Sequence, residues 1–186
     1  MQVAIKTMAR ELSSKNRQMA WIDQADDEVA IRLGTIPARW GRMTPLGRAL
    51  LLESAYLLEE KKLWRNGGKV SDDGVSAGLI GAGRYGSLQT DLDFQDTVAG
   101  GLASPALFGY TLPNIPLAEV ATHFGLTGPV YALLEGKEPL NAAVREAQAL
   151  LETDSRLSFM LACSFDYYPA GPNGLALTLT VVKRDV

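Results

Sequence analysis

The sequence is poor in the residues that most catalytic and metal sites use. Its 186 residues include one cysteine, Cys163, and one histidine, His123. A single cysteine cannot form an internal disulfide, so nothing requires an oxidising compartment. No apolar run approaches the roughly 20 residues of a membrane helix, and residues 1–6 lack the apolar core of a signal peptide. We therefore expect a cytoplasmic protein with no membrane partner, no metal and no cofactor.

The charge and length of the chain restrict its class further. The formal net charge is −3, which does not favour nucleic-acid binding. Apolar residues make up 47% of the chain, as in ordinary globular proteins. A chain of this length predicts one domain, residues 1–186, with a core of its own.

Hydrophobic spacing predicts alternating strands and helices. Strands are expected at Val3–Met8, Val75–Ile80, Pro129–Leu134, Leu157–Phe165 and Leu175–Val181. Helices are expected from Thr44-Pro45 to Leu58, at Asp91–Val98, at Ile115–Phe124 and at Pro139–Leu151. Residues 6–42 are expected to be irregular. The turn at 168–174 makes the last two strands antiparallel, and the whole pattern predicts a layered α/β domain.

A glycine-rich segment follows the second expected strand. Gly81, Gly83 and Gly86 fit the spacing G-x-G-x-x-G of dinucleotide sites. That fingerprint also needs an acidic residue about 20 positions further on, and residues 100–110 contain none. We therefore favour a glycine turn where backbone passes close to backbone.

Three short motifs then follow one another: Ser104-Pro105, Pro113-Asn114 and Gly128-Pro129. Their order and spacing resemble the N-terminal half of the β-ketoacyl synthases, condensing enzymes of the thiolase fold. The resemblance implies one half of a thiolase-like fold, βαβαβαββ, with a five-stranded mixed sheet and helices on both faces. In that family a reactive cysteine stands nine residues after the glycine, at the start of a buried helix. The same count from Gly128 leads to Lys137.

Lys137 does not suit the family's chemistry. A thiolate holds the acyl chain as a thioester, and a helix N-terminus favours that anion. An amine adds positive charge there and gives no exchangeable thioester. Cys163 lies in an apolar strand, where free cysteines behave as small core residues. The resemblance is to acyltransferases, but we expect no catalysis by this chain alone; an enzyme using Cys163 or a Schiff base at Lys137 is a less favoured alternative.

The resemblance instead implies a non-catalytic partner subunit. It is similar to the chain-length factors that pair with an active ketosynthase in fatty acid or polyketide (aryl-polyene-type) biosynthesis and shape its acyl tunnel. Acyl carrier protein is the further partner that this implies. The expected tunnel and interface residues are Ser104, Pro105, Phe108, Tyr110, Asn114, Val130, Tyr131 and Leu133. Core packing is an equal alternative for the aromatic residues among them. A standalone homodimer that binds acyl chains or carrier protein, or acts as a scaffold, is the second hypothesis.

Two surfaces are also predicted. Residues 29–52 contain no acidic residue, and Arg39, Arg42 and Arg48 could form a patch for a carrier protein; a solvated charged loop is the alternative. The helix expected at 139–151 is apolar or small nearly all round, which indicates burial on all sides. Half of the family's fold cannot cover it, so we expect an exposed apolar patch and association through the strand Val130–Leu134.

Overall fold

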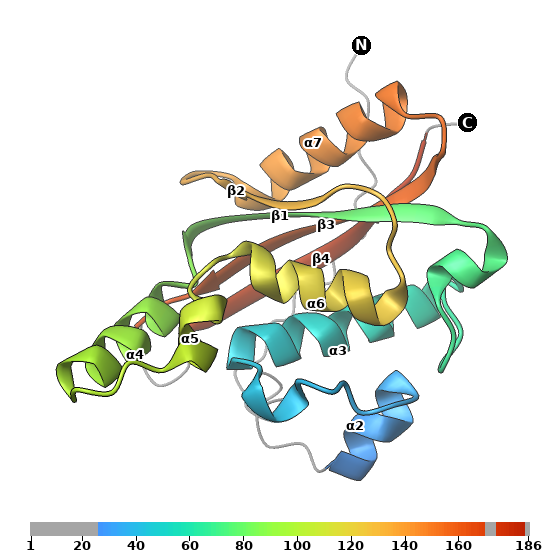
Figure 1. The fold of residues 1–186 in the computed structure, drawn as a ribbon. Coiled ribbons are helices and arrows are strands. Elements are labelled where there is room, and N and C mark those ends of the chain that lie inside the picture. The colour runs from blue at the N-terminus through green and yellow to red at the C-terminus, as the bar shows by residue number, and fades with distance from the viewer. Residues whose placement is uncertain (1–25, 170–173, 185–186) are drawn as a thin grey trace.

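The computed structural model describes residues 26–169 and 174–184 (Figure 1). Its four strands form one sheet in the order β2-β1-β3-β4. They are β1 (Ser76–Gly86), β2 (Val130–Leu134), β3 (Leu157–Tyr167) and β4 (Leu175–Val182). β1 pairs in parallel with β2 and β3, and β3 pairs antiparallel with β4, as the short turn predicts.

The predicted count of five strands is wrong for the described residues. The strand expected at Val3–Met8 lies outside them. β1 and β3 pair directly, with Ile80 opposite Ala162, so no further strand can lie between them. A further strand could join this sheet only at one of its edges.

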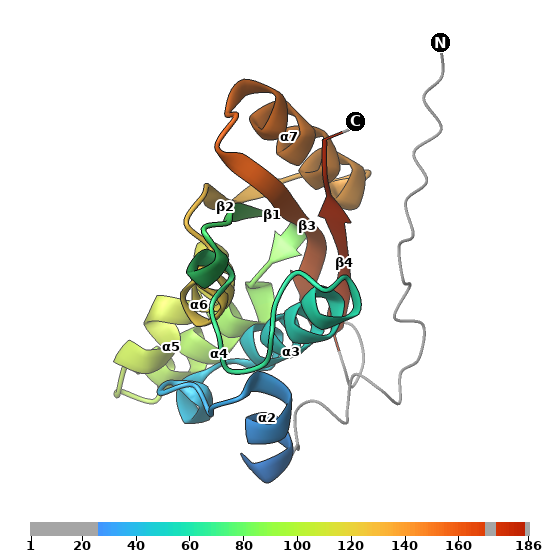
Figure 2. The ribbon, with the colours of Figure 1, turned by 90° about the vertical axis from the view of Figure 1, so that its right-hand side faces the viewer.

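The helices cover both faces of the sheet, as predicted (Figures 1 and 2). α7 (Pro139–Thr153) lies on one face, and α3 (Pro45–Glu60) and α6 (Asn114–Phe124) lie on the other. The remaining helices are α2 (Asp26–Leu33), α4 (Leu88–Ala99) and α5 (Pro105–Tyr110), with the 3-10 turns η1 (Trp40–Arg42) and η2 (Val70–Asp73). The prediction of irregular structure up to residue 42 is therefore wrong for α2 and η1.

Each face of the sheet has its own core. On the α7 side, Ile80, Met160 and Ala162 pack against Ala143 and Ala147. On the other side, residues of β1, β3 and β4 pack against α3 and α6; this larger cluster includes Leu79, Leu161, Phe165, Leu50, Leu117 and Phe124. The two-residue alternation of each strand supplies both cores.

Capping residues set the predicted start of α3 and the start of α5, a helix that the sequence analysis did not predict. Gly47 donates its N–H to Thr44 Oγ1 at 3.4 Å, and Pro45 follows as the first helical residue. Leu107 donates its N–H to Ser104 Oγ at 3.3 Å, so the Ser104-Pro105 motif is the start of α5. A hydroxyl cap satisfies a backbone donor that the helix leaves free.

The expectation that α7 is buried on all sides is wrong. Its buried residues, Ala143, Val144, Ala147 and Leu151, form one stripe that faces the sheet. Arg145 and Glu152 are exposed on its outer side. The large exposed apolar side chains lie elsewhere, and several belong to α4, α5 and the loops beside them.

The glycine segment is mostly strand, not turn. β1 continues to Gly86, which alone of the three has a positive φ, 56°. A Cβ on Gly81 would lie 2.5 Å from the Phe165 ring, and one on Gly83 would lie 2.2 Å from the Phe165 carbonyl oxygen. Close packing of β1 against β3 thus explains Gly81 and Gly83.

Candidate functional site

The candidate site is the end of the sheet where β1 and β2 finish. After β1 the chain enters α4, and after β2 it passes Lys137 into α7. Parallel strands end on the same side, and the carboxyl ends of such strands are the usual place for ligand sites in α/β sheets. The α4–α5 hairpin, residues 88–112, projects beyond this end (Figure 1).

Lys137 stands where the resemblance places the nucleophile. It lies in the loop after β2, and α7 begins two residues later at Pro139. The side chain is exposed, and its backbone N–H donates to Glu135 Oε1 at 2.8 Å. That bond is the main cause that lowers the pKa of Glu135. Glu138 is also exposed beside it, so this helix start carries one amine and two carboxyl groups.

Cys163 and His123 lie away from this position. Cys163 is fully buried in β3, opposite Gly81 and Leu179, and burial raises the pKa of its thiol strongly. His123 lies near the end of α6, where its Nε2 is 3.2 Å from the Leu33 carbonyl oxygen and links α6 to α2. Burial, together with the charge of Lys69, lowers its pKa.

Strand β2 forms one edge of the described sheet, as its predicted role in association requires. Tyr131 and Leu133 pack on the α7 side, whereas Val130 packs with the larger core. Tyr131 donates its hydroxyl to Glu146 of α7. Burial and this bond raise the pKa of Tyr131 to about 12.

Asn114 covers part of that edge. Its Oδ1 accepts the Ala132 N–H at 2.7 Å. In the parallel register, Leu79 N–H bonds to the Pro129 carbonyl and Glu135 N–H bonds to the Gly83 carbonyl. The backbone N–H and C=O groups of the odd-numbered β2 residues therefore point toward β1. The backbone N–H of Ala132 points outward, away from the sheet. A strand that pairs at Ala132 has to displace the Asn114 side chain.

The two aromatic residues of α5 lie in different environments. Phe108 is 60% exposed and packs on Phe94 of α4, with ring centroids 5.4 Å apart. Tyr110 is buried and donates its hydroxyl to Glu119 at 3.1 Å. Burial raises the pKa of Tyr110 to about 12, with Glu119 as a further cause. Phe108 is thus available to a partner, whereas Tyr110 is part of the core.

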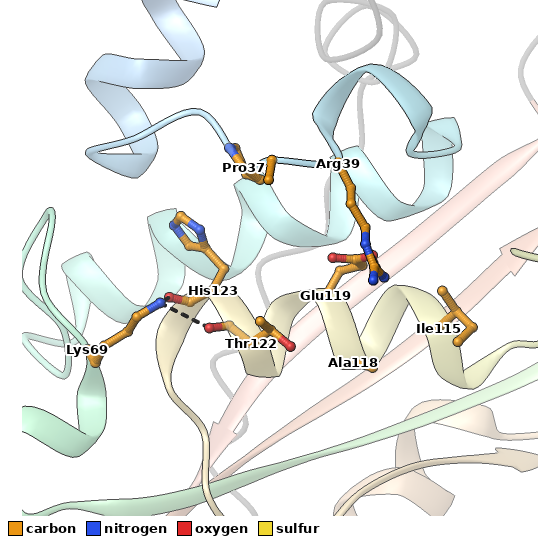
Figure 3. Close-up of a pocket in the computed structure, with 9 residues that line it drawn as sticks. Pro37, Arg39, Lys69, Ile115, Ala118, Glu119, Thr122 and His123 are labelled. Carbon is orange, nitrogen blue, oxygen red and sulfur yellow. Dashed lines mark hydrogen bonds and ion pairs between the residues drawn. The ribbon is translucent and has the colours of Figure 1, made fainter. Parts of the chain in front are cut away.

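The predicted arginine patch borders a shallow cavity of about 320 Å³ (Figure 3). Arg39 is at its rim, with its guanidinium 3.3 Å from Glu119 of α6. Arg42 is exposed nearby in the sequence. Arg48 has a structural role, because it donates to the Trp40 carbonyl at 3.2 Å and lies over the Trp40 ring.

Lys69 and Glu119 were not among the residues predicted from the sequence. Lys69 Nζ donates to the Thr122 and His123 carbonyls at 3.0 and 2.5 Å and so closes the end of α6 (Figure 3). Glu119 joins Arg39 to Tyr110. Lys69 is 53 residues from Thr122 in sequence, and Glu119 is 80 residues from Arg39. Contacts over such separations leave no local sequence pattern.

The described residues contain neither a metal-binding cluster nor a membrane-spanning helix. Across residues 26–169 and 174–184, no group of three His, Cys, Asp or Glu side chains is arranged to hold a metal ion. Within the same ranges, no helix has both the length and the apolar character to cross a membrane.

Comparisons with known proteins identify the fold. No family model and no curated protein matches the sequence. Among solved structures, the ishigamide ketosynthase/chain length factor matches with a TM-score of 0.63 and 17% identity, over 84% of this chain and 47% of that one. A ketosynthase in complex with its chain length factor from Xenorhabdus doucetiae matches with a TM-score of 0.63 and 15% identity, over 95% and 75%.

A β-ketoacyl synthase from Burkholderia phymatum gives a TM-score of 0.58 at 13% identity, over 77% of this chain and 43% of that one. The chain thus spans less than half of two of these three structures. Identities this low carry the fold and no more. The chain therefore has an α/β fold similar to that of these ketosynthase and chain-length-factor structures.

Proposed function

We propose that the protein is a non-catalytic, chain-length-factor-like subunit that pairs with an active ketosynthase in the cytoplasm. The chemistry of condensation then belongs to the partner, and this chain contributes the shape of the acyl tunnel. The observation that carries the proposal is the pairing of a ketosynthase-like fold with an exposed lysine, Lys137, at the start of α7.

The two candidate nucleophiles in the chain, Cys163 and Lys137, are poorly suited to catalysis. The thiol of Cys163 is fully buried with a raised pKa, so it is a poor nucleophile. The amine of Lys137 is exposed, whereas Schiff-base lysines are activated by desolvation or by a cationic neighbour. Its charged neighbours in the loop are the carboxyl groups of Glu135 and Glu138, not cations.

Phe108 is the residue that we propose limits product length. Its ring projects from a six-residue helix at the carboxyl end of the strands and is 60% exposed. A rigid aromatic side chain at an interface can close an apolar channel without any bond being made. Ser104 sets the start of that helix and so sets the position of the ring.

Association is proposed at the same end of the molecule, along β2 and α5. Leu134 at the end of β2 is 82% exposed, and the outward N–H groups of β2 face no described strand. Acyl carrier protein is proposed to bind the surface around Arg39 and Arg42, whose positive charges attract the acidic side chains of a carrier protein.

The test is to co-produce the chain with a ketosynthase encoded near its gene and purify through a tag on this chain alone. An equimolar complex is expected, and its polyketide or fatty acyl products are measured by mass spectrometry. Phe108→Ala should lengthen the products, and Phe108→Trp should shorten them.

The matched control is Tyr110→Phe, which keeps a buried ring and removes only the hydroxyl bond to Glu119. It should leave product length unchanged. Recovery of this chain without ketosynthase, as a homodimer, would favour the acyl-binding scaffold instead. Products of the same length from all three variants would exclude the proposed role of Phe108.

A further inference from the structure

The cavity beside Arg39 runs along one face of α6. Ile115, Ala118 and Thr122 line it and recur at helical spacing, so they lie on the same side of that helix. The loop that carries Pro37 lines the cavity as well (Figure 3). Its volume of about 320 Å³ is at the lower end of the range for small-molecule sites. None of its lining residues belongs to β2, α4 or α5, so the cavity is separate from the surface proposed for the ketosynthase.

A cation lies at each end of the cavity, and each has more hydrogen-bond donors than its described contacts use. Figure 3 shows Arg39 and Lys69 at opposite ends, with Thr122 between them. The Arg39 guanidinium, which has five N–H donors, lies 3.3 Å from Glu119, and 67% of the side chain is exposed. Lys69 is exposed, and two of its three N–H donors bond to the Thr122 and His123 carbonyls. Both side chains therefore have donors left for an anion.

Positive charge exceeds negative charge among the lining residues. Arg39 and Lys69 supply two cations, and Glu119 is the one carboxylate among the described residues that line the cavity. Its Oε1 accepts from both Arg39 and the Tyr110 hydroxyl, and only 11% of its side chain is exposed. Lys69 forms no ion pair within the described residues. The cavity thus has room in its charge balance for a bound anion.

The two cations are held about one helical turn apart. Arg39 bonds to Glu119, and Lys69 bonds to the carbonyls of the residues three and four positions further along α6. This separation corresponds to about 5–6 Å along the helix axis. Apolar surface of Pro37 and Ala118 adjoins this stretch. A ligand that fits has two negative ends joined by a short apolar chain.

We propose that this cavity binds a short linear dicarboxylate, with one carboxylate at Arg39 and the other at Lys69. Charge-assisted hydrogen bonds are the strong ones in proteins, and succinate, glutarate and adipate place their two charges at distances of this order. A monocarboxylate reaches only one of the two cations and so binds more weakly. The inference does not depend on the proposed function, and the cavity shares only Arg39 with the surface proposed for acyl carrier protein.

His123 offers a built-in reporter of this site. It is the only histidine of the chain and it lines the cavity. Its Nε2 is 3.2 Å from the Leu33 carbonyl oxygen, and burial, followed by the charge of Lys69, lowers its pKa. The other charged groups of the cavity, Arg39 and Glu119, pair with each other. A carboxylate bound at Lys69 offsets the lysine charge, so the pKa of His123 should rise toward 6.5 when the ligand binds.

The first experiment titrates the full chain with succinate, glutarate and adipate at constant ionic strength and follows the His123 imidazole signals by NMR. Butyrate and pentanoate are the monocarboxylate counterparts. At least one dicarboxylate should give saturable shifts, with an affinity at least about tenfold above that of the monocarboxylates, as one additional charge-assisted contact predicts. Signals that do not move, that move equally with the monocarboxylates, or that report a lower pKa for His123 would overturn the proposal.

Charge-removing variants test the two ends of the site. Arg39→Gln and Lys69→Gln should each lower the dicarboxylate affinity at least about tenfold. The matched controls, Arg65→Gln and Lys183→Gln, remove the same charge from exposed positions outside the cavity and should lose far less. Equal losses in variants and controls would mean a general effect of net charge and would overturn the proposal.

A third pair of variants fills the cavity and leaves every charge in place. Ala118 is exposed on α6 and leucine is a good helix former, so Ala118→Leu should fold normally and abolish dicarboxylate binding. Ala149→Leu on the exposed side of α7 should bind as wild type does. This pair decides the matter if Lys69→Gln disturbs the end of α6, and binding retained in Ala118→Leu would overturn the proposal.

The same titrations separate this inference from the proposed function. A chain that binds a dicarboxylate as described but recovers no ketosynthase retains this inference and loses the proposed function. A chain that recovers the ketosynthase but binds no dicarboxylate loses this inference alone.

Discussion

β1 and α4 are neighbours in sequence, separated only by Ser87, yet they differ sharply in burial. Eight of the eleven residues of β1 are buried, whereas α4 buries one of twelve. β1 sits between two strands and contributes to the cores on both faces of the sheet. α4 packs mainly on α5, which itself buries one residue of six.

This difference separates what folds the chain from what the chain offers to others. Burial of apolar surface contributes about 25 cal/mol per Å², so the sheet with α3, α6 and α7 supplies most of the stability. A helical hairpin that buries so little adds little to that sum. The exposed apolar side chains of this ordered hairpin lie at the end of the molecule where we propose association with a partner.

The largest expected contrast is in thiol reactivity. Cys163 is fully buried and burial raises its pKa, so iodoacetamide reaches it only when the core opens. A thiol introduced by Leu102→Cys in a Cys163→Ser background lies at a position that is 82% exposed in wild type. Global stabilities of about 5–15 kcal/mol predict labelling of Cys163 at least ~1000-fold slower than that of residue 102.

Mass spectrometry of timed samples gives both rates, and labelling in denaturant confirms that each thiol can react. Comparable rates in the native protein would show that β3 opens as readily as the hairpin, which would remove the distinction between the two regions. Rapid native labelling of Cys163 would also revive it as a candidate nucleophile.

A smaller contrast is expected in stability. Leu117 is fully buried in α6, and Leu117→Ala should lower the free energy of unfolding by about 2–5 kcal/mol through lost burial and a cavity. Leu102→Ala removes the same atoms from an exposed position and should change it by less than about 0.5 kcal/mol. Urea unfolding of the free protein measures both.

The same two variants sharpen the comparison when a partner is present. Leu102→Ala should weaken the complex although it leaves the free chain unchanged, whereas Leu117→Ala should act mainly on folding. A Leu102→Ala variant that is strongly destabilised as a free chain would mean that the hairpin belongs to the core.

The sequence predicted the central part of the fold well because that part follows local rules. The apolar strands β1 to β4, the Thr44-Pro45 start of α3 and the antiparallel last pair all depend on periodicity, capping or a short turn. The resemblance added the placement of Lys137 near the start of the helix after β2, and in the structure it lies two residues before α7 begins.

Long-range contacts account for what the sequence did not predict. Glycine at position 83 is required by the nearby Phe165 carbonyl, 82 residues away in sequence, whereas the local glycine pattern predicts a turn. The expectation that α7 is buried on all sides rested on its alanine and leucine residues, whereas Arg145 and Glu152 are exposed on its solvent side. The apolar side chains of the hairpin are exposed because no described element packs over them, and a local sequence pattern cannot predict that.

The smallest expected contrast is in the titration of two aspartates, one beside the sheet and one in the hairpin. Arg156 holds Asp154, at the end of α7, through bonds of 2.7 and 2.9 Å, which lowers its pKa from 3.8 to about 2. Burial instead raises the pKa of Asp91 above 3.8. The two groups should therefore respond to acid in opposite directions.

A lowered native pKa means that Asp154 stabilises the fold above about pH 4, and that this contribution is lost as the pH falls toward 2. A raised native pKa means that Asp91 opposes folding when ionised, so its penalty is relieved as the pH falls through its native pKa toward 3.8. Carboxyl carbon NMR should therefore find Asp91 titrating above 3.8 and Asp154 near 2. An Asp91 midpoint at or below 3.8 in the free chain would mean that the hairpin already contains its counter-charge.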